Sequence, residues 1–355
     1  MELLSVTMND GVKPRSEIEG KDNSSEDKSN YKIVRKGDMV YNSMRMWQGA
    51  NGISPCDGIV SPAYTVLMPK QEINNGYFAA LFKSANLINE FRKNSQGMTS
   101  DTWNLKYPQI ETIKVQIPSV SEQDKVSELF GVLDARIVAQ AQLIEALKKY
   151  KRGLVFHIFR GNNPFGFEMK VTPMNDLLHE YRNRDTVNLR VCSVAVNKGV
   201  VDQVEHLGRS FAAADTSNYG RVKPGDVVYT KSPTGCFPYG IVKQNWMDEE
   251  VAVSPLYGVY TPVSKDAGYL LHTYFEQSQN ANNYIRTLAQ KGAKNTINIT
   301  TSHFLDKSII FPSNEDCVSH LAKMFAVISA EISLAEKELE LLLRQRKTLL
   351  QQLFI

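Results

Sequence analysis

Two long segments of the chain carry apolar residues at alternating spacings of four and three. In the first segment these residues are Val126, Phe130, Leu133, Ile137, Ile144, Leu147, Leu154 and Ile158. In the second they are Leu321, Phe325, Ile328, Ile332, Ala335, Leu339, Leu342, Leu349 and Leu353. A heptad pattern held for more than four heptads predicts a long helix with one apolar seam, as in a coiled coil.

Three polar residues interrupt these seams. Gln140 and Lys151 fill two gaps in the first seam, and Arg346 interrupts the second, 195 positions after Lys151. Two matching seams on one chain indicate that the helices pair with each other. The alternative is that each is an amphipathic helix packed on its own domain. The positions expected to pair are Phe130, Leu133, Ile137, Ile144, Leu147 and Leu154 with Phe325, Ile328, Ile332, Leu339, Leu342 and Leu349.

Shorter patterns precede each long helix. Residues 31–42 and 219–230 mix β-forming residues with a Gly-Asp turn, which predicts strands on both sides of that turn. Residues 77–93 and 269–290 repeat apolar residues three and four apart, which predicts one helix in each.

Two Ser-Pro pairs interrupt these patterns, and two further prolines end them. Ser61-Pro62 and Ser254-Pro255 follow short apolar runs and indicate the start or end of an edge strand. A final β run ends at Ile117-Pro118 and again at Phe311-Pro312. A strand is therefore expected just before each long helix.

These patterns belong to one unit that the chain contains twice. Gly37-Asp38-Met39-Val40-Tyr41 reappears 188 positions later as Gly225-Asp226-Val227-Val228-Tyr229. Ile117-Pro118 recurs 194 positions later as Phe311-Pro312. Such an ordered self-match predicts two copies of one structural domain. Two copies of a binding unit suit a target with two separate halves.

The expected fold class is α+β, with two mixed α/β domains separated by two long helices that form an antiparallel coiled coil. The first mixed domain is expected over residues 1–118 and its helix over 119–160. The second mixed domain is expected over residues 161–312 and the last helix over 313–355. Residues 166–189 have no counterpart in the first domain, so we expect that domain to be shortened at its start, by truncation or by a shortened gene.

Composition is that of a soluble globular protein, with 42% hydrophobic and 22% charged residues. No apolar stretch reaches 18 residues and no signal segment opens the chain, which indicates a cytoplasmic protein. The cysteines (Cys56, Cys192, Cys236, Cys317) form no CxxC pair, so neither a zinc site nor a disulfide framework is expected. With a net charge of only +3, any binding to phosphates must use a local face.

The order and spacing of these motifs resemble the specificity subunit of type I restriction–modification systems. In the first copy the similar stretches are residues 36–43 (Lys-Gly-Asp-Met-Val-Tyr-Asn-Ser), 45–49 (Arg-Met-Trp-Gln-Gly), 59–64, Ile117-Pro118 and Glu122-Gln123. In the second they are residues 223–229, 253–257 and Glu315-Asp316. The resemblance covers essentially the whole chain. It departs from the family at the start of the first domain.

The resemblance implies a non-catalytic protein that recognises DNA. In the family, each mixed domain is a target recognition domain that reads half of a split sequence in double-stranded DNA. The two helices pair antiparallel, set the distance between the domains and dock two methyltransferase subunits. A motor–nuclease subunit joins for cleavage. S-adenosylmethionine, ATP and magnesium belong to those partners, so no cofactor, metal site, catalytic residue or membrane contact is expected here.

Two segments in each domain are candidates for DNA contact. The segment after each Gly-Asp strand differs between the copies although its flanks match, and a polar loop follows each mid-domain helix. Arginine and lysine suit guanine edges or phosphates, and asparagine and glutamine suit adenine. The alternative is an ordinary solvated loop. The candidates are Asn42, Ser43, Arg45, Gln48, Arg92, Lys93, Thr99, Ser100, Asn104, Thr230, Lys231, Ser232, Lys291, Lys294, Asn295 and Asn298.

Two other classes of function compete with DNA recognition. A coiled-coil scaffold explains the heptads but not the duplicated mixed domains. A DNA-modifying enzyme needs a motif for the flipped base, and Asn162-Asn163-Pro164-Phe165 lacks its second proline. A GxxxxGK loop for ATP is also missing from the sequence. Both alternatives therefore explain less than a specificity subunit does.

Overall fold

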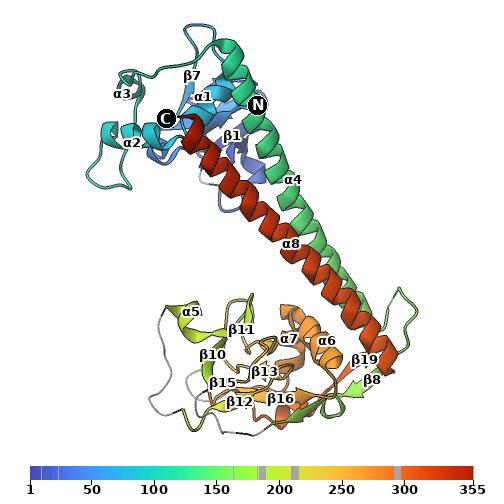
Figure 1. Ribbon diagram of the computed structural model, residues 1–355. Coiled ribbons are helices and arrows are strands. Elements are labelled where there is room, and N and C mark those ends of the chain that lie inside the picture. Colours follow the sequence, from blue (N-terminus) through green and yellow to red (C-terminus); the bar gives the residue numbers. More distant parts are fainter. Residues whose placement is uncertain are drawn as a thin grey trace. The chain divides into compact units, whose positions relative to one another are not determined.

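The computed structural model describes residues 1–8, 10–22, 24–162, 164–181, 183, 189–208, 216–291 and 297–354 (Figure 1). The chain forms two compact units. Unit 1 comprises Met1–Leu143 with Ala335–Ile355, and unit 2 comprises Ile144–Leu334. The long helices α4 (Val120–Ile158) and α8 (Glu315–Leu353) each contribute residues to both units.

Unit 1 is a mixed α/β structure. Its elements are β1 (Glu2–Thr7), β2 (Gly11–Pro14), η1 (Arg15–Glu17), β3 (Lys32–Val34), β4 (Met39–Asn42), η2 (Met46–Gln48), β5 (Asn51–Ile53), β6 (Gly58–Val60), β7 (Tyr64–Leu67), α1 (Asn75–Leu81), α2 (Ala85–Asn94) and α3 (Tyr107–Ile110), with parts of α4 and α8.

Unit 2 repeats this order with additional strands. Its elements are β8 (Met169–Pro173), η3 (Met174–Asp176), β9 (Leu178–Glu180), β10 (Arg190–Ala195), β11 (Gly199–Asp202), α5 (Gln203–Leu207), β12 (Gly220–Val222), β13 (Val227–Tyr229), β14 (Val242–Gln244), β15 (Val251–Val253), β16 (Gly258–Pro262), α6 (Lys265–Phe275), α7 (Ser278–Ile285), β17 (Gln290–Lys291), β18 (Ile297–Asn298), η5 (His303–Leu305) and β19 (Ser308–Pro312), with parts of α4 and α8.

The sheets confirm the duplication. The order β2-β1-β6-β3 in unit 1 matches β11-β10-β15-β12 in unit 2, and β5-β4-β7 matches β14-β13-β16. The register is also shared, since Leu4 pairs with Pro14 and Cys192 pairs with Asp202, both 188 positions apart. In unit 2 the second sheet carries one more strand, β9.

The repeated Gly-Asp motif has a structural role. Gly37 and Gly225 have φ of +90° and +92°, which other residues adopt only with strain. The carboxylate of Asp38 accepts a hydrogen bond from Arg35 N at 2.9 Å and that of Asp226 from Lys223 N at 2.8 Å. Each motif therefore builds a tight turn whose backbone donors are satisfied.

The strands after these turns contribute to two cores at once. Tyr41 and Tyr229 are fully buried in the cores that contain the helices. The preceding residues, Val40 and Val228, point to the opposite face of the strand and lie in the cores of the four-stranded sheets. The Val-Tyr pair recurs because it joins two layers of each unit.

Each expected mid-domain helix is in fact two helices. Residues 77–93 are divided between α1 and α2, since the hydroxyl of Ser84 accepts a hydrogen bond from Leu87 N and starts the second helix. In unit 2, α6 begins earlier than expected, where Ser264 Oγ accepts from Ala267 N at 3.1 Å. The apolar spacing therefore predicted helical structure correctly, and the serine caps show where α2 and α6 begin.

Two strand expectations were wrong. Pro62 and Pro255 follow β6 and β15, which are interior strands of their sheets and not edge strands. Each proline stands after the last paired residue, so no hydrogen bond of the ladder is lost. The run that ends at Phe311-Pro312 is the strand β19, but the run that ends at Ile117-Pro118 is not a strand.

Both long helices are present as the heptads predicted, and the twelve expected pairing positions are buried or half-buried. Within unit 1 the contacts ascend along α4 as they descend along α8, so these segments are antiparallel. The side chain of Gln140 donates to Ala335 O at 3.0 Å, Arg346 pairs with Asp134, and the ring of Phe130 stacks on Phe354.

The alternative interpretation of the seams holds as well. In unit 2, Leu154 and Ile158 of α4 and Leu321 and Phe325 of α8 are buried in the core of the mixed domain. In unit 2 the segments of both helices therefore pack on the mixed domain.

Candidate nucleic-acid interface

In unit 1 the structure brings the two candidate segments together. Leu105 N donates to Ser43 O at 2.8 Å, which ties the loop after α2 to the end of β4. Trp47 and Trp103 meet edge to face, with ring centroids 5.1 Å apart, and the guanidinium of Arg92 lies 5.9 Å from the Trp47 ring. We call Trp47, Arg92 and Trp103 the tryptophan cluster. Trp103 is half-exposed there.

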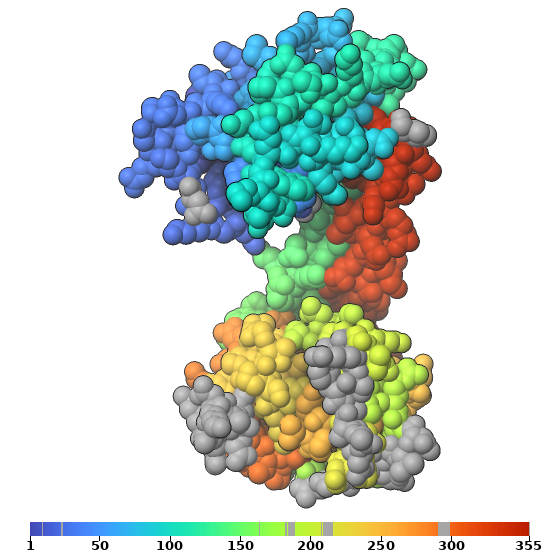
Figure 2. Space-filling model, turned by 90° about the vertical axis from the view of Figure 1, so that its left-hand side faces the viewer, coloured from blue at the N-terminus to red at the C-terminus, as the bar shows by residue number. Residues whose placement is uncertain are grey.

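The loop after α2 is a hairpin. Gln96 and Asn104 exchange two backbone hydrogen bonds of 3.0 and 2.8 Å. Thr99 and Ser100 are exposed near its tip. Figure 2 shows the part of unit 1 that includes α2 and α3, coloured cyan to blue-green, on the near surface. The hairpin therefore presents polar side chains to solvent.

Three candidates have a side-chain oxygen buried instead. The Ser43 hydroxyl contacts Thr65 Oγ1 at 3.3 Å, and Thr230 Oγ1 accepts from Ile241 N at 3.1 Å. The side-chain oxygen of Asn104 is buried without a hydrogen-bond partner among the described residues. Burial removes these groups from the set that can face a ligand, and they position the loops.

The remaining candidates of unit 1 differ in their availability. Arg45 and Gln48 are half-buried, and the described residues offer neither side chain an ion pair or hydrogen bond. Asn42 Oδ1 accepts from Met44 N at 3.1 Å, which shapes the turn after β4. Lys93 lies 2.8 Å from Glu90, so its charge is locally compensated. Arg45, Gln48 and Arg92 are thus the groups with free donors.

In unit 2 the strand β13 ends in an unusual backbone. Lys231 has φ of +56°, rare for a residue with a side chain, and burial lowers the pKa of its amine. Its Nζ lies 3.5 Å from Thr301 Oγ1. A Cβ at Gly240 would lie 2.9 Å from Lys231 N, so only glycine fits the close approach there. Ser232 is exposed beside it.

The second polar loop of unit 2 has the same frame as the hairpin of unit 1. Gln290 pairs with Asn298, and both positions lie 194 after Gln96 and Asn104. Lys294 and Asn295 lie outside the described residues, as do the side chains of Lys291 and Asn298. A shared frame therefore carries different loop sequences in the two units.

The basic residues at the end of the first helix do not all face solvent. Lys151 Nζ lies 2.6 Å from Glu276 Oε2, and Lys243 and His272 approach the same carboxylate. Burial alone would raise the pKa of Glu276, but the hydrogen bond from His272 and the two lysines hold it well below its ordinary value. Lys151 interrupts the heptad seam because it serves this cluster.

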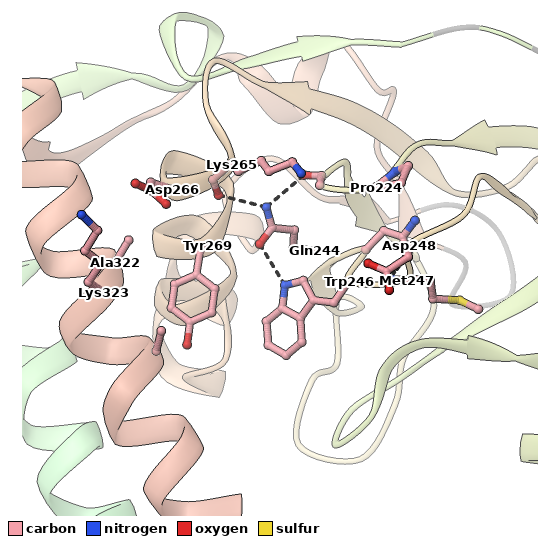
Figure 3. Close-up of a pocket in the computed structure, with 13 residues that line it drawn as sticks. Pro224, Gln244, Trp246, Met247, Asp248, Lys265, Asp266, Tyr269, Ala322 and Lys323 are labelled. Atoms are coloured by element: carbon pink, nitrogen blue, oxygen red, sulfur yellow. Dashed lines mark hydrogen bonds between the residues drawn. The ribbon is translucent and has the colours of Figure 1, made fainter.

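Sequence reasoning did not find the cavity of about 410 Å³ that lies beside α8 in unit 2 (Figure 3). Trp246 forms one wall, stacks on Tyr269 and donates to Gln244 Oε1 at 2.9 Å. The amide of Gln244 in turn donates to Gly225 O and Lys265 O. The charged lining residues are Asp248, Lys265, Asp266 and Lys323, so the cavity offers no net positive charge to a phosphate.

The described part of the chain holds no cluster of three metal-ligating side chains. Cys56, Cys192, Cys236 and Cys317 are free thiols, and burial raises the pKa of Cys192 to about 12. One helix, α8, is long and apolar enough to cross a membrane. In α8, Leu321, Phe325 and Leu342 are buried against protein, whereas Val327, Leu334 and Leu341 are exposed.

Known proteins resemble this chain in sequence and in fold. Residues 5–149 match the family model of the type I restriction modification DNA specificity domain. The S subunit of a type I restriction-modification system from M. genitalium has a similar fold, with a TM-score of 0.54 and 13% identity over 91% of this chain and 84% of that one. The HsdS subunit from Thermoanaerobacter tengcongensis aligns over 92% and 82%, at 13% identity and a TM-score of 0.45. No curated protein matches the chain.

Proposed function

We propose that this chain, a specificity subunit of the type I restriction–modification family, reads its DNA target in two halves, one with each mixed domain. The observation that carries the proposal is the shared frame with different loops. Gln96 and Asn104 pair as Gln290 and Asn298 do, yet the sequences between them differ. Two readers of different half-sites need this combination.

In unit 1, the side chains with free hydrogen-bond donors contact the base edges. Arg45 and Arg92 suit guanine edges and Gln48 suits adenine, while Thr99 and Ser100 suit phosphates. In unit 2, Lys231 and Ser232 stand at the equivalent place, and Lys291, Lys294, Asn295 and Asn298 belong to the second loop. The net charge of +3 gives little general attraction to DNA, so binding depends on these loops.

The helices have a separate role in the proposal. We propose that α4 and α8 pair as an antiparallel coiled coil, separate the recognition domains (residues 1–118 and 161–312) and dock two methyltransferase subunits. The antiparallel contacts within unit 1 support the pairing. Val327, Leu334 and Leu341 recur every seven residues on α8 and are exposed, which suits a second apolar seam for a partner.

Catalysis belongs to the partners. The methyltransferase subunits supply the S-adenosylmethionine chemistry and a motor–nuclease subunit uses ATP and magnesium, all in the cytoplasm. The isolated chain is therefore expected to transfer no methyl group to DNA. Methyl transfer by the purified chain alone would contradict this assignment.

A domain exchange tests the two-reader arrangement. Residues 161–312 are replaced by those of a related specificity subunit, and the chimera is purified with the methyltransferase partner. The methylated sequence is then mapped on a random DNA library. We expect one half of the target to change and the other to stay. A change in both halves would show that the domains do not read independently.

A further inference from the structure

Two cavities of unit 2 meet at the start of α6. The larger one is the cavity of about 410 Å³ beside α8, and Figure 3 shows its lining. The second has a volume of about 360 Å³. Lys265 and Asp266 line both cavities, and α8 forms one wall of each, with lining residues between positions 315 and 326. We call the two cavities together the α8 groove.

In unit 1 the corresponding helices, α1 and α4, are in direct contact. Asn74, which caps α1, donates from its backbone to Gln123 Oε1 at 2.9 Å and from its side chain to Asp124 Oδ1 at 2.7 Å. A Cβ at Gly76 would collide with Ser127 Oγ. In unit 2, no hydrogen bond among the described residues joins α8 to the first turn of α6. The α8 groove is therefore a feature of unit 2 and not of the shared repeat.

Trp246 is the largest side chain that lines the groove, and it is 55% exposed. Its ring is fixed, because it stacks on Tyr269 with centroids 5.7 Å apart and its Nε1 donates to Gln244 Oε1 at 2.9 Å. The amide nitrogen of Gln244 is itself held by Gly225 O and Lys265 O. Since the indole N–H is already satisfied, the exposed part of the ring offers a ligand a π surface and not a hydrogen bond.

Carboxylates surround this ring. The four acidic residues that line the groove are Asp248, Asp266, Glu315 and Asp316. None of their side chains makes an ion pair or a hydrogen bond with another described residue. The lining includes two cations, Lys265 and Lys323, so carboxylates are in excess. The groove therefore favours a cationic ligand over a phosphate.

Helix ends explain only part of this excess. Asp266 lies in the first turn of α6, and Glu315 and Asp316 lie in the first turn of α8, where acidic residues stabilise a helix. Asp248 lies in the loop after β14 and is exposed beside Trp246, so no helix end explains it. An exposed, fixed indole next to such a carboxylate is the combination that binds a guanidinium group.

We propose that the α8 groove binds an extended, arginine-containing segment of a partner polypeptide. One guanidinium group stacks on the exposed surface of Trp246 and pairs with Asp248. Arginine suits both contacts, because its planar group stacks on an aromatic ring and donates two parallel hydrogen bonds to a carboxylate. A second arginine pairs with Glu315 and Asp316 in the smaller cavity.

The groove sets the spacing of the two arginines. Asp316 lines the smaller cavity and Lys323 lines the larger one, seven positions further along α8. Seven residues of helix correspond to about 10 Å along its axis. An extended chain covers that distance in about three residues. The expected motif is therefore two arginines separated by two other residues.

Two other occupants fit the groove less well. A nucleic-acid backbone would bring phosphates against an excess of carboxylates. An apolar helix would cover those carboxylates without giving them a partner, which is costly. No candidate residue for DNA contact lines either cavity, so the inference does not depend on the proposed function.

A phage-displayed library of random twelve-residue peptides, selected on the full chain, tests the proposal. We expect enrichment of peptides with two arginines three positions apart. Multivalent display retains weakly binding peptides, so a selection that enriches nothing would overturn the proposal. Enrichment of only acidic or uncharged peptides would overturn it as well.

A labelled peptide of the selected sequence is then titrated with variants of the chain. Trp246→Leu keeps an apolar side chain but removes the π surface, and it should weaken binding about fivefold. Asp266→Asn should weaken binding about threefold. The matched control Asp176→Asn removes an exposed carboxylate that lines neither cavity and should leave binding unchanged. Equal binding by Trp246→Leu, Asp266→Asn and the unchanged chain would overturn the proposal.

A change in the peptide removes any effect of a variant on folding. Citrulline in place of each arginine keeps the shape and removes the charge, and it should weaken binding to the unchanged chain at least about tenfold. Equal binding of the two peptides would contradict recognition of a cation. Asp266→Asn should bind target DNA as the unchanged chain does. Loss of DNA recognition with intact peptide binding would contradict the proposed function alone.

Discussion

Replacement of Glu276 by glutamine tests the buried ion cluster that ties α4 to unit 2. The carboxylate lies 2.6 Å from Lys151 Nζ and 3.8 Å from Lys243 Nζ, and His272 Nε2 lies 3.6 Å away. His272 Nδ1 accepts from Gln244 N, so Nε2 carries the proton that faces Glu276. Glutamine keeps the shape but leaves two buried lysines without their counter-charge.

The expected loss follows from burial. Removing one partner of a buried pair costs about 3–5 kcal/mol. Because the Glu276 side chain is 34% exposed, water screens part of this, and we expect about 3 kcal/mol. The double variant with Lys151→Met should lose less than the sum of the two single variants, since no unpaired lysine then remains at that position.

Trp246 provides the assay because it stacks on Tyr269 and contacts the His272 ring. In a background with Trp47 and Trp103 replaced by phenylalanine, it is the single tryptophan and reports urea unfolding of unit 2. A loss below about 1 kcal/mol would refute the buried-pair reasoning.

The pH dependence supplies a second criterion. The folded pKa of Glu276 lies below its ordinary value of 4.5, so its contribution is present above pH 4.5 and is lost as pH falls toward the folded value. The difference between the unchanged chain and Glu276→Gln should therefore shrink by about 1 kcal/mol between pH 6 and pH 4. A difference that stays constant over this range would contradict the assignment.

Three further changes have defined outcomes. Burial lowers the pKa of Lys83 to about 8, below the unfolded value of 10.5, so Lys83→Met should stabilise unit 1 at pH 7. That gain should diminish between pH 8 and pH 10.5, because Lys83 of the unchanged chain loses its proton in the folded state before it does so in the unfolded state. Urea unfolding followed by Trp47 and Trp103 fluorescence measures this change. Arg45→Ala should weaken DNA binding by about 1–3 kcal/mol and relax the preference for one base of the target. Lys93→Ala, which removes a lysine that is already paired with Glu90, should have a smaller effect that is equal for all target sequences. Anisotropy titrations with single-base variants of the target measure both effects. Gly240→Ala should destabilise unit 2 by about 1–3 kcal/mol, since φ is +95° and the new Cβ would meet Lys231 N, and its thermal unfolding midpoint should fall.

The sequence predicted features that depend on local periodicity. The heptads identified α4 and α8 because their apolar positions repeat along one segment. The self-match identified the duplicated sheets because equal patterns fold equally. Ser84 was a readable signal for the break between α1 and α2, since serine before an apolar run is a typical helix cap.

Features that depend on distant contacts could not be predicted. Trp47 and Trp103 are 56 positions apart, and only the tertiary fold brings their rings together. Periodicity marked Lys151 as an exception but gave no hint of Glu276. The run before Ile117 has strand propensity, yet it forms no strand because a strand also needs a partner.

The central claim is that one chain directs recognition of two separate half-sites. Mapping of methylated adenines in cells that carry this chain with the proposed methyltransferase partner tests it most directly. We predict a split motif, with two short defined sequences separated by a gap of fixed length and unspecified bases. A continuous motif without a gap would contradict the account.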